Sequence, residues 1–85
     1  MSVSFISDSP VFNINATGAL GAGLSAREVQ CIYLASLGRT NRDIGVALGI
    51  TANTVIAHLA HARDKLGAEN KTHTVAEAFR RGVIS

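Results

Sequence analysis

The residues best suited to bind a ligand gather at the start of a helix expected to begin near position 41. Thr40, Asn41 and Arg42 supply a hydroxyl, an amide and a cation there. Backbone N–H groups are unpaired at a helix N-terminus and the helix dipole is positive there, so such a site attracts phosphate. The residue types therefore indicate phosphate binding and need no catalytic group.

Metal binding and catalysis have weaker support in this sequence. His58 and His61 lie three residues apart, a spacing that allows two ligands on one helix, but no third ligand is obvious. Cys31 lies on an apolar helix face, where a thiol stays protonated and unreactive. The glycine-rich run at 18–23 lacks the Lys-Ser/Thr pair of a phosphate-binding P-loop. We therefore expect no enzyme, no metal and no cofactor.

The helices that must position the phosphate-binding groups are joined by a short turn. Thr40 and Thr51 are suited to cap helices expected at 41–48 and 52–66. Gly49 suits a left-handed helix end, because a residue without a Cβ is least strained there. The second helix carries a buried stripe at helical spacing, made of Val55, Leu59, Ala62 and Leu66. This arrangement is typical of a helix-turn-helix, whose second helix enters the DNA major groove; a plain helical hairpin is the alternative.

Two further helices complete an all-α domain. Ser25 and Glu28 have the spacing of a capping box, which predicts a first helix at about 25–37. Thr72 is expected to cap a last helix at about 73–81. The sequence therefore predicts four helices, with the helix-turn-helix in the middle of the domain.

Charge and composition divide the chain into two parts. All eight lysines and arginines lie after position 26, and the same part of the chain contains five acidic residues. This mild excess of positive charge permits phosphate contact without demanding it. Residues 1–23 form an arm, irregular or a short β-hairpin, that ends in a glycine-rich linker. We therefore divide the chain into an N-terminal arm at 1–23 and a helix-turn-helix domain at 24–85.

The sequence also predicts where the protein acts. No apolar run is long enough to span a bilayer, and no lysine or arginine precedes position 27, as a signal or transit peptide would require. Cys31 is the single cysteine, which suits a reducing cytosol. We expect a cytoplasmic, nucleoid-associated protein without a membrane partner.

Past the linker, the sequence resembles the LuxR/GerE-type DNA-binding domains. The resemblance is carried by Leu-Ser-Ala-Arg-Glu at 24–28, Gly38, Ile44, Gly49-Ile50, Thr54-Val55, His58 and Lys65-Leu66-Gly67. Cys31, Gly45 and Asn-Lys-Thr-His at 70–73 make it most similar to the quorum-sensing branch of these bacterial regulators. Members of that branch usually carry an acyl-homoserine-lactone domain before the linker, and residues 1–23 are too few for one. A single-domain regulator or a fragment is therefore expected.

The resemblance implies a domain that binds duplex DNA as a dimer, with helix 52–66 as the recognition helix. It implies that Thr54 holds a phosphate, that Val55 packs near the groove, and that His58 and Lys65 support or neutralise backbone phosphates. The full set of DNA-binding candidates is Thr40, Asn41, Arg42, Thr51, Asn53, Thr54, Val55, Ala57, His58, His61 and Lys65. The dimer contact implied for the last helix comprises Val75, Ala78 and Phe79.

The base-reading side departs from the family pattern. Ile56, Ala57 and Ala60 stand where the family commonly has lysine, arginine or another polar residue. Arginine or lysine reads guanine and asparagine or glutamine reads adenine, whereas aliphatic side chains touch thymine methyls or respond to DNA shape. Asn53 and His61 offer the polar groups on that side.

Two functions therefore stay open. The first is a bacterial transcription regulator that binds duplex DNA, as a homodimer through its last helix. The second is a module that keeps the fold without binding DNA, and pairs with and modulates a full-length LuxR-type regulator. The apolar surface of the third helix supports the second function, and the helix-turn-helix with its phosphate-binding residues supports the first.

Overall fold

The computed structural model of the chain describes residues 23–85. Within this range the chain forms four helices and no strand, namely α3 (Ala26–Ser36), α4 (Asn41–Leu48), α5 (Ala52–Leu66) and α6 (Lys71–Arg80). The predicted all-α class is therefore confirmed. The arm predicted to be irregular or a short hairpin lies outside the described residues, so the boundary between arm and domain stays a prediction.

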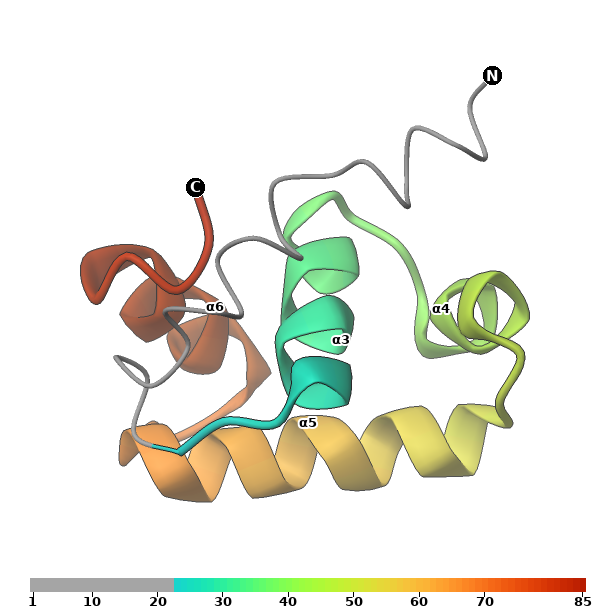
Figure 1. Ribbon diagram of the computed structural model, residues 1–85, viewed down its shortest axis with the longest axis horizontal. Helices are drawn as coiled ribbons and strands as arrows, with labels where there is room; N and C mark the ends of the chain where they lie inside the picture. The colour runs from blue at the N-terminus through green and yellow to red at the C-terminus, as the bar shows by residue number, and fades with distance from the viewer. Residues whose placement is uncertain (1–22) are drawn as a thin grey trace.

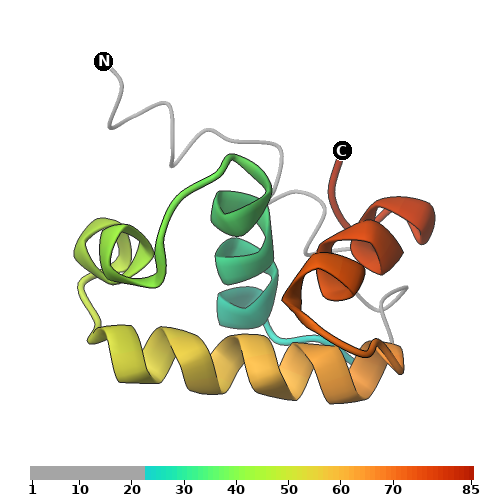
Figure 2. The same ribbon diagram turned by 180° about the vertical axis from the view of Figure 1, so that it is seen from behind.

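The long helix α5 lies along one side of the domain, and the other three helices pack against it (Figure 1). In both views α4 lies at the beginning of α5, α6 lies near its end, and α3 lies between them (Figure 2). All three are on the same side of α5, so none of the described helices covers its opposite side. We call this opposite side the uncovered side of α5.

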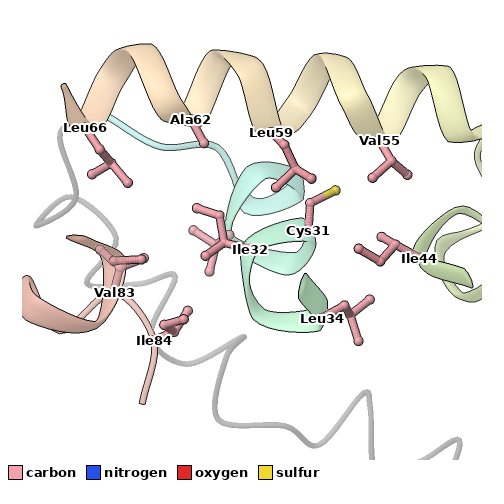
Figure 3. Close-up of a cluster of buried hydrophobic side chains, with 12 residues drawn as sticks. Cys31, Ile32, Leu34, Ile44, Val55, Leu59, Ala62, Leu66, Val83 and Ile84 are labelled. Atoms are coloured by element: carbon pink, nitrogen blue, oxygen red, sulfur yellow. The ribbon is translucent and has the colours of Figure 1, made fainter. Parts of the chain in front are cut away.

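Aliphatic side chains from the helices and the C-terminal segment meet in one core, shown in Figure 3. Helix α5 contributes the four residues predicted as its buried stripe, Val55, Leu59, Ala62 and Leu66. Ile32 of α3 and Ile44 of α4 are fully buried against them. The stripe fixes the rotation of α5 about its own axis, and this rotation decides which residues face outward.

Short-range capping bonds set the limits of the first three helices. The predicted capping box is present, because Ser25 Oγ accepts from the Glu28 N–H at 3.1 Å and Glu28 Oε1 accepts from the Ser25 N–H at 2.9 Å. Thr40 and Thr51 cap α4 and α5, each accepting a backbone N–H at 3.1 Å. Gly49 ends α4 in the left-handed conformation, with φ of 72°. These caps and the limits of α4 and α5 are as predicted, and α3 is one residue shorter at each end.

The last helix begins two residues earlier than predicted. Its N-cap is Asn70, whose Oδ1 accepts the His73 N–H at 2.8 Å, and Thr72 lies inside the helix. The prediction that Thr72 is the cap is therefore wrong. Asparagine caps at least as well as threonine, and a cap at Asn70 pairs helix N–H groups that a later start would leave outside the helix.

Removing this cap should give a measurable loss of stability. We expect Asn70→Ala to lower the free energy of unfolding by about 1 kcal/mol, as loss of an asparagine cap does elsewhere. Thr72→Ala is the matched control and should change it by less than about 0.5 kcal/mol. Urea unfolding followed by circular dichroism measures both variants. A larger effect at Thr72 than at Asn70 would move the helix start back to the predicted position.

The residues after α6 contribute to the core, which the sequence analysis did not anticipate. Gly82 adopts a left-handed φ of 73°, and the chain then turns back so that the Val83 N–H donates to the Ala78 carbonyl at 2.8 Å. Val83 and Ile84 are fully buried. Both belong to the core, whereas Phe79 of α6 is 46% exposed.

Candidate nucleic-acid interface

The turn between α4 and α5 holds the two helices at a fixed angle. Their axes are bent by 104° with respect to each other, within the range of 90–120° usual for a helix-turn-helix. Gly45 lies against the turn: a Cβ on this residue would be 2.6 Å from the carbonyl oxygen of Ile50. The Ile50 N–H in turn donates to the Gly45 carbonyl at 2.9 Å. Backbone contact at Gly45 thus sets the direction in which α5 leaves the turn.

The uncovered side of α5 presents a stripe of four residues, which we call the outer stripe: Asn53, Ile56, Ala57 and Ala60. Their spacing of three, four and seven residues places them on one face of a helix. Asn53 and Ala57 are exposed, Ile56 is 49% exposed, and Ala60 is half-buried. The outer stripe therefore combines one amide with three aliphatic side chains, as the sequence analysis expected for the base-reading side.

A shallow depression of about 170 Å³ lies beside the outer stripe. It is lined by Asn41, Ile56, Leu59, Ala60, Arg63 and Lys71. The Lys71 ammonium donates to Asn41 Oδ1 at 3.0 Å, which joins the start of α6 to the start of α4. Two cations, Arg63 and Lys71, thus lie next to the aliphatic residues of the stripe. Lys71 was not predicted as a site residue, because nothing local in the sequence shows that it reaches a residue 30 positions away.

The predicted phosphate-binding residues lie at the starts of α4 and α5. Thr40 and Arg42 are exposed, and Asn41 is half-buried. At α5, the Thr51 and Thr54 hydroxyls are hydrogen-bonded to each other at 2.9 Å. Both helix starts therefore offer hydroxyls beside backbone N–H groups, the arrangement that favours an anion.

These features are those of a helix-turn-helix domain, and comparison with known families identifies which one. Residues 22–78 match the GerE family, described as bacterial regulatory proteins, luxR family. This chain is a member of the luxR family. The predicted resemblance is thereby confirmed: the chain carries the helix-turn-helix of bacterial transcription regulators of the quorum-sensing kind, and DNA binding is implied by that membership. The family is one of regulators and not of enzymes.

Relatives with similar sequences are full regulators. The chain is 47% identical over 62 residues to the transcriptional activator protein BjaR1 of Bradyrhizobium diazoefficiens, covering 73% of this chain and 26% of that protein. It is 39% identical over 61 residues to the HTH-type quorum sensing-dependent transcriptional regulator VjbR of Brucella ovis, covering 72% and 24%. It is 36% identical over 61 residues to the transcriptional activator protein AhyR of Aeromonas hydrophila, again covering 72% and 24%. The LuxR-family chain thus spans about a quarter of the length of these relatives. No solved structure matches it significantly.

Two predicted DNA contacts of this LuxR-family domain lie away from the outer stripe. Val55 is fully buried, so its side chain supports α5 from inside the core. The Lys65 ammonium donates to both carboxylate oxygens of Glu28, at 2.9 and 3.1 Å, and to the Gly23 carbonyl at 3.2 Å. Lys65 therefore holds the end of α5 to the start of α3, a role that the sequence analysis did not assign. Its contact with phosphate stays a prediction.

Burial and pairing act in opposite directions on the Glu28 carboxyl. Burial favours its neutral form, but the Ser25 N–H and the Lys65 ammonium outweigh burial and lower the pKa of Glu28 below its ordinary value. The side chain is nearly inaccessible to solvent. The Glu28 anion thus belongs to the capping box of α3 and is paired with Lys65 of α5, so it joins the two helices.

The two histidines of α5 that were predicted to face DNA differ in exposure. His58 is half-buried and His61 is exposed. Within residues 23–85, no group of three or more His, Cys, Asp or Glu side chains is arranged to hold a metal ion. Burial raises the pKa of the Cys31 thiol to about 11, in keeping with the unreactive thiol expected from the sequence.

The residues predicted for a dimer contact differ in exposure. Ala78 is fully buried inside the domain, whereas Val75 is half-buried and Phe79 is largely exposed. Beside them, the Glu77 carboxylate lies 2.9 Å from an Arg80 nitrogen and 3.4 Å from an Arg81 nitrogen. Of these three predicted residues, Val75 and Phe79 are therefore the ones open to a partner.

No single helix in residues 23–85 is long and apolar enough to cross a bilayer, although α4 and α5 would meet the criterion if they were counted together.

Proposed function

We propose that this LuxR-family chain binds duplex DNA as a transcription regulator, with α5 as the helix that enters the major groove. The observation that carries the proposal is the outer stripe, which none of the described helices covers and which Arg63 and Lys71 flank. An uncovered helix at 104° to its neighbour, with cations beside it, matches the shape and charge of a major groove lined by phosphates.

The residues at the two helix starts would hold the DNA backbone. In this proposal Thr40, Asn41 and Arg42 bind one phosphate at the start of α4, and Thr51 and Thr54 bind another at the start of α5. The support is that Thr40, Arg42 and Thr51 are exposed and that the first turn of a helix carries backbone N–H groups without helical partners. His58 and His61 would lie near the phosphates at the edges of the groove. Contacts of this kind fix the register of the helix and leave base recognition to the outer stripe.

The domain would act as a homodimer formed through α6. The support is the exposed Phe79 and the half-buried Val75 next to it, which a second copy would cover. A small domain gains stability from such association. A dimer would bind two half-sites about one helical turn apart, on DNA of the nucleoid in the cytoplasm.

The same α6 surface supports a second candidate function. Phe79 would be equally well covered by the last helix of another LuxR-type regulator, so the chain could form mixed pairs and modulate that regulator. Measuring DNA binding by the purified chain separates the two candidates. A module that acts by pairing alone has no affinity for DNA.

The proposed phosphate contacts predict how binding depends on salt. We expect Arg42→Ala to weaken binding to all DNA sequences and to lower the slope of log K against log salt concentration by about one. Arg80→Ala is the matched control, because Arg80 lies at the end of α6 and pairs with Glu77. Fluorescence anisotropy with labelled duplexes at a series of salt concentrations measures both. A folded chain that shows no salt-sensitive DNA binding would refute the proposed function.

A further inference from the structure

We propose that the outer stripe recognises the 5-methyl group of pyrimidines in the major groove, so that this domain selects its half-site by thymine methyls. The inference rests on the proposed function, because it requires α5 to lie in the groove. It extends that function by naming the base feature that the helix reads.

The three aliphatic residues of the stripe cannot read guanine in the usual way. Ile56, Ala57 and Ala60 carry no hydrogen-bond donor, so they cannot pair with the N7 and O6 acceptors of guanine. The apolar feature that a base pair presents in the major groove is the C5 methyl of thymine. Burying an aliphatic side chain against a base edge is favourable where that edge is apolar, as it is at this methyl group. The methyl is therefore the feature complementary to this stripe.

The surroundings of the stripe fit DNA. Ile56 and Ala60 line the depression together with Arg63 and Lys71, so aliphatic groups lie directly beside cations. The cations can meet phosphates while the aliphatic groups meet base edges. The short side chains of Ala57 and Ala60 also let the helix backbone approach the bases closely. Beside each alanine there is then room for a methyl group of a base.

The stripe is limited at both ends by polar residues. Asn53 begins it, and an asparagine amide pairs with N6 and N7 of adenine. Asp64, four residues after Ala60, is paired with Arg63 at 3.1 Å and carries a charge that phosphate repels. The outer stripe from Asn53 to Ala60 is roughly 10 Å long, or about three base pairs. We therefore infer a short half-site rich in A·T pairs, with adenine at Asn53 and thymine methyls along the aliphatic residues.

A protein partner is the competing occupant of this surface. A stable protein interface buries roughly 800 Å² on each side, more than one isoleucine and two alanines can supply. The Lys71 ammonium, whose partner Asn41 is neutral, would also have to lose water in such an interface without an anion to pair with. These observations favour DNA as the occupant.

Uracil in place of thymine removes the methyl group and leaves base pairing unchanged. The purified chain first selects its preferred site from a random-sequence duplex library, and each thymine of that site is then replaced by uracil. We expect a loss of about fourfold in affinity for each methyl that the stripe covers, the ratio that burial of one methyl group provides. The salt dependence should stay unchanged, because no phosphate contact is altered.

A variant of the stripe identifies the residue responsible. Ile56→Ser should bring the affinity ratio of thymine to uracil close to one at a single position of the site. Val46→Ser is the matched control: Val46 lies on α4, is 79% exposed, and is not part of the outer stripe. This variant should keep the wild-type ratio. Thermal unfolding of both variants confirms that they are folded.

The outcomes separate the inference from the proposed function. Tight, salt-sensitive binding in which uracil has no effect at any position would overturn the inference and leave the proposed function standing. A uracil effect that Ile56→Ser does not reduce would also overturn it. A folded chain that binds no DNA would refute the proposed function, and the inference with it.

Discussion

Replacing Gly45 by alanine is expected to destabilise this domain by about 2 kcal/mol. The added Cβ would lie 2.6 Å from the carbonyl oxygen of Ile50 and 3.3 Å from the backbone nitrogen of Ala52. Both neighbours are backbone atoms of the turn, so no flexible side chain can move aside. Relief requires the turn to shift, and α5 would shift with it. DNA affinity should therefore fall together with stability.

The expected loss of stability in Gly45→Ala has the opposite sign to the usual effect of this substitution in a helix. In an open helix, alanine stabilises by up to about 1 kcal/mol relative to glycine, so without the close contact Gly45→Ala would raise stability. Urea unfolding measures the change. Val46→Ala on the same helix is the control and should stay within about 0.5 kcal/mol, because Val46 is largely exposed. A Gly45→Ala variant at least as stable as the wild type would show that the turn is looser than described.

Features that depend on neighbouring residues were predictable from the sequence. The caps at Ser25, Thr40 and Thr51 each use a backbone group three residues away, so the cap residue and its helix can be recognised together. The buried stripe of α5 follows from helical periodicity in the same way. The cap of α6 was predicted wrongly as Thr72. Asn70 and Thr72 have similar capping ability, and their positions in the sequence do not show which of them is the cap.

Features that depend on distant residues were not predictable. The pairs Lys65–Glu28 and Lys71–Asn41 join residues 37 and 30 positions apart, and a local pattern says nothing about such contacts. The burial of Val83 and Ile84 depends on how the chain turns back after α6. The sequence therefore predicted the helices that carry the candidate site and the residues at their starts. It did not predict that Arg63 and Lys71 lie beside the outer stripe.

The Lys65–Glu28 pair leads to the second large effect. We expect Glu28→Gln to lower the free energy of unfolding by about 2 kcal/mol at pH 7, because it removes the charge from a buried, hydrogen-bonded carboxylate. The value lies below that of a fully buried pair, because the Lys65 side chain is 38% exposed and partly screened by water. Urea unfolding of both proteins at pH 7 measures it. A loss below about 0.5 kcal/mol would show that the pair contributes little.

The same carboxylate predicts how this difference depends on pH. The pKa of Glu28 is lower in the folded chain than its ordinary value of 4.5, so its stabilisation is complete above pH 4.5 and is lost as the pH falls through the folded pKa. Protonated glutamate resembles glutamine in shape, and the stability difference between wild type and Glu28→Gln should therefore shrink below pH 4.5. The pKa of Glu77 is also lowered: burial opposes the shift, and Arg80 and Arg81 outweigh it. Glu77→Gln is thus the control. The Glu28 carboxylate is intact in this variant, so comparing it with Glu28→Gln isolates the part of the pH dependence that Glu28 causes.

Lys65→Met then separates the two roles that Lys65 has been given. If Lys65 acts on the fold, the methionine variant loses stability, and combining it with Glu28→Gln costs less than the sum of the two single changes. If Lys65 also binds phosphate, the salt dependence of DNA binding falls by about one as well. An ammonium already shared by two carboxylate oxygens and a carbonyl has little capacity for a phosphate. We therefore expect the stability to change and the salt dependence to stay as it is in the wild type.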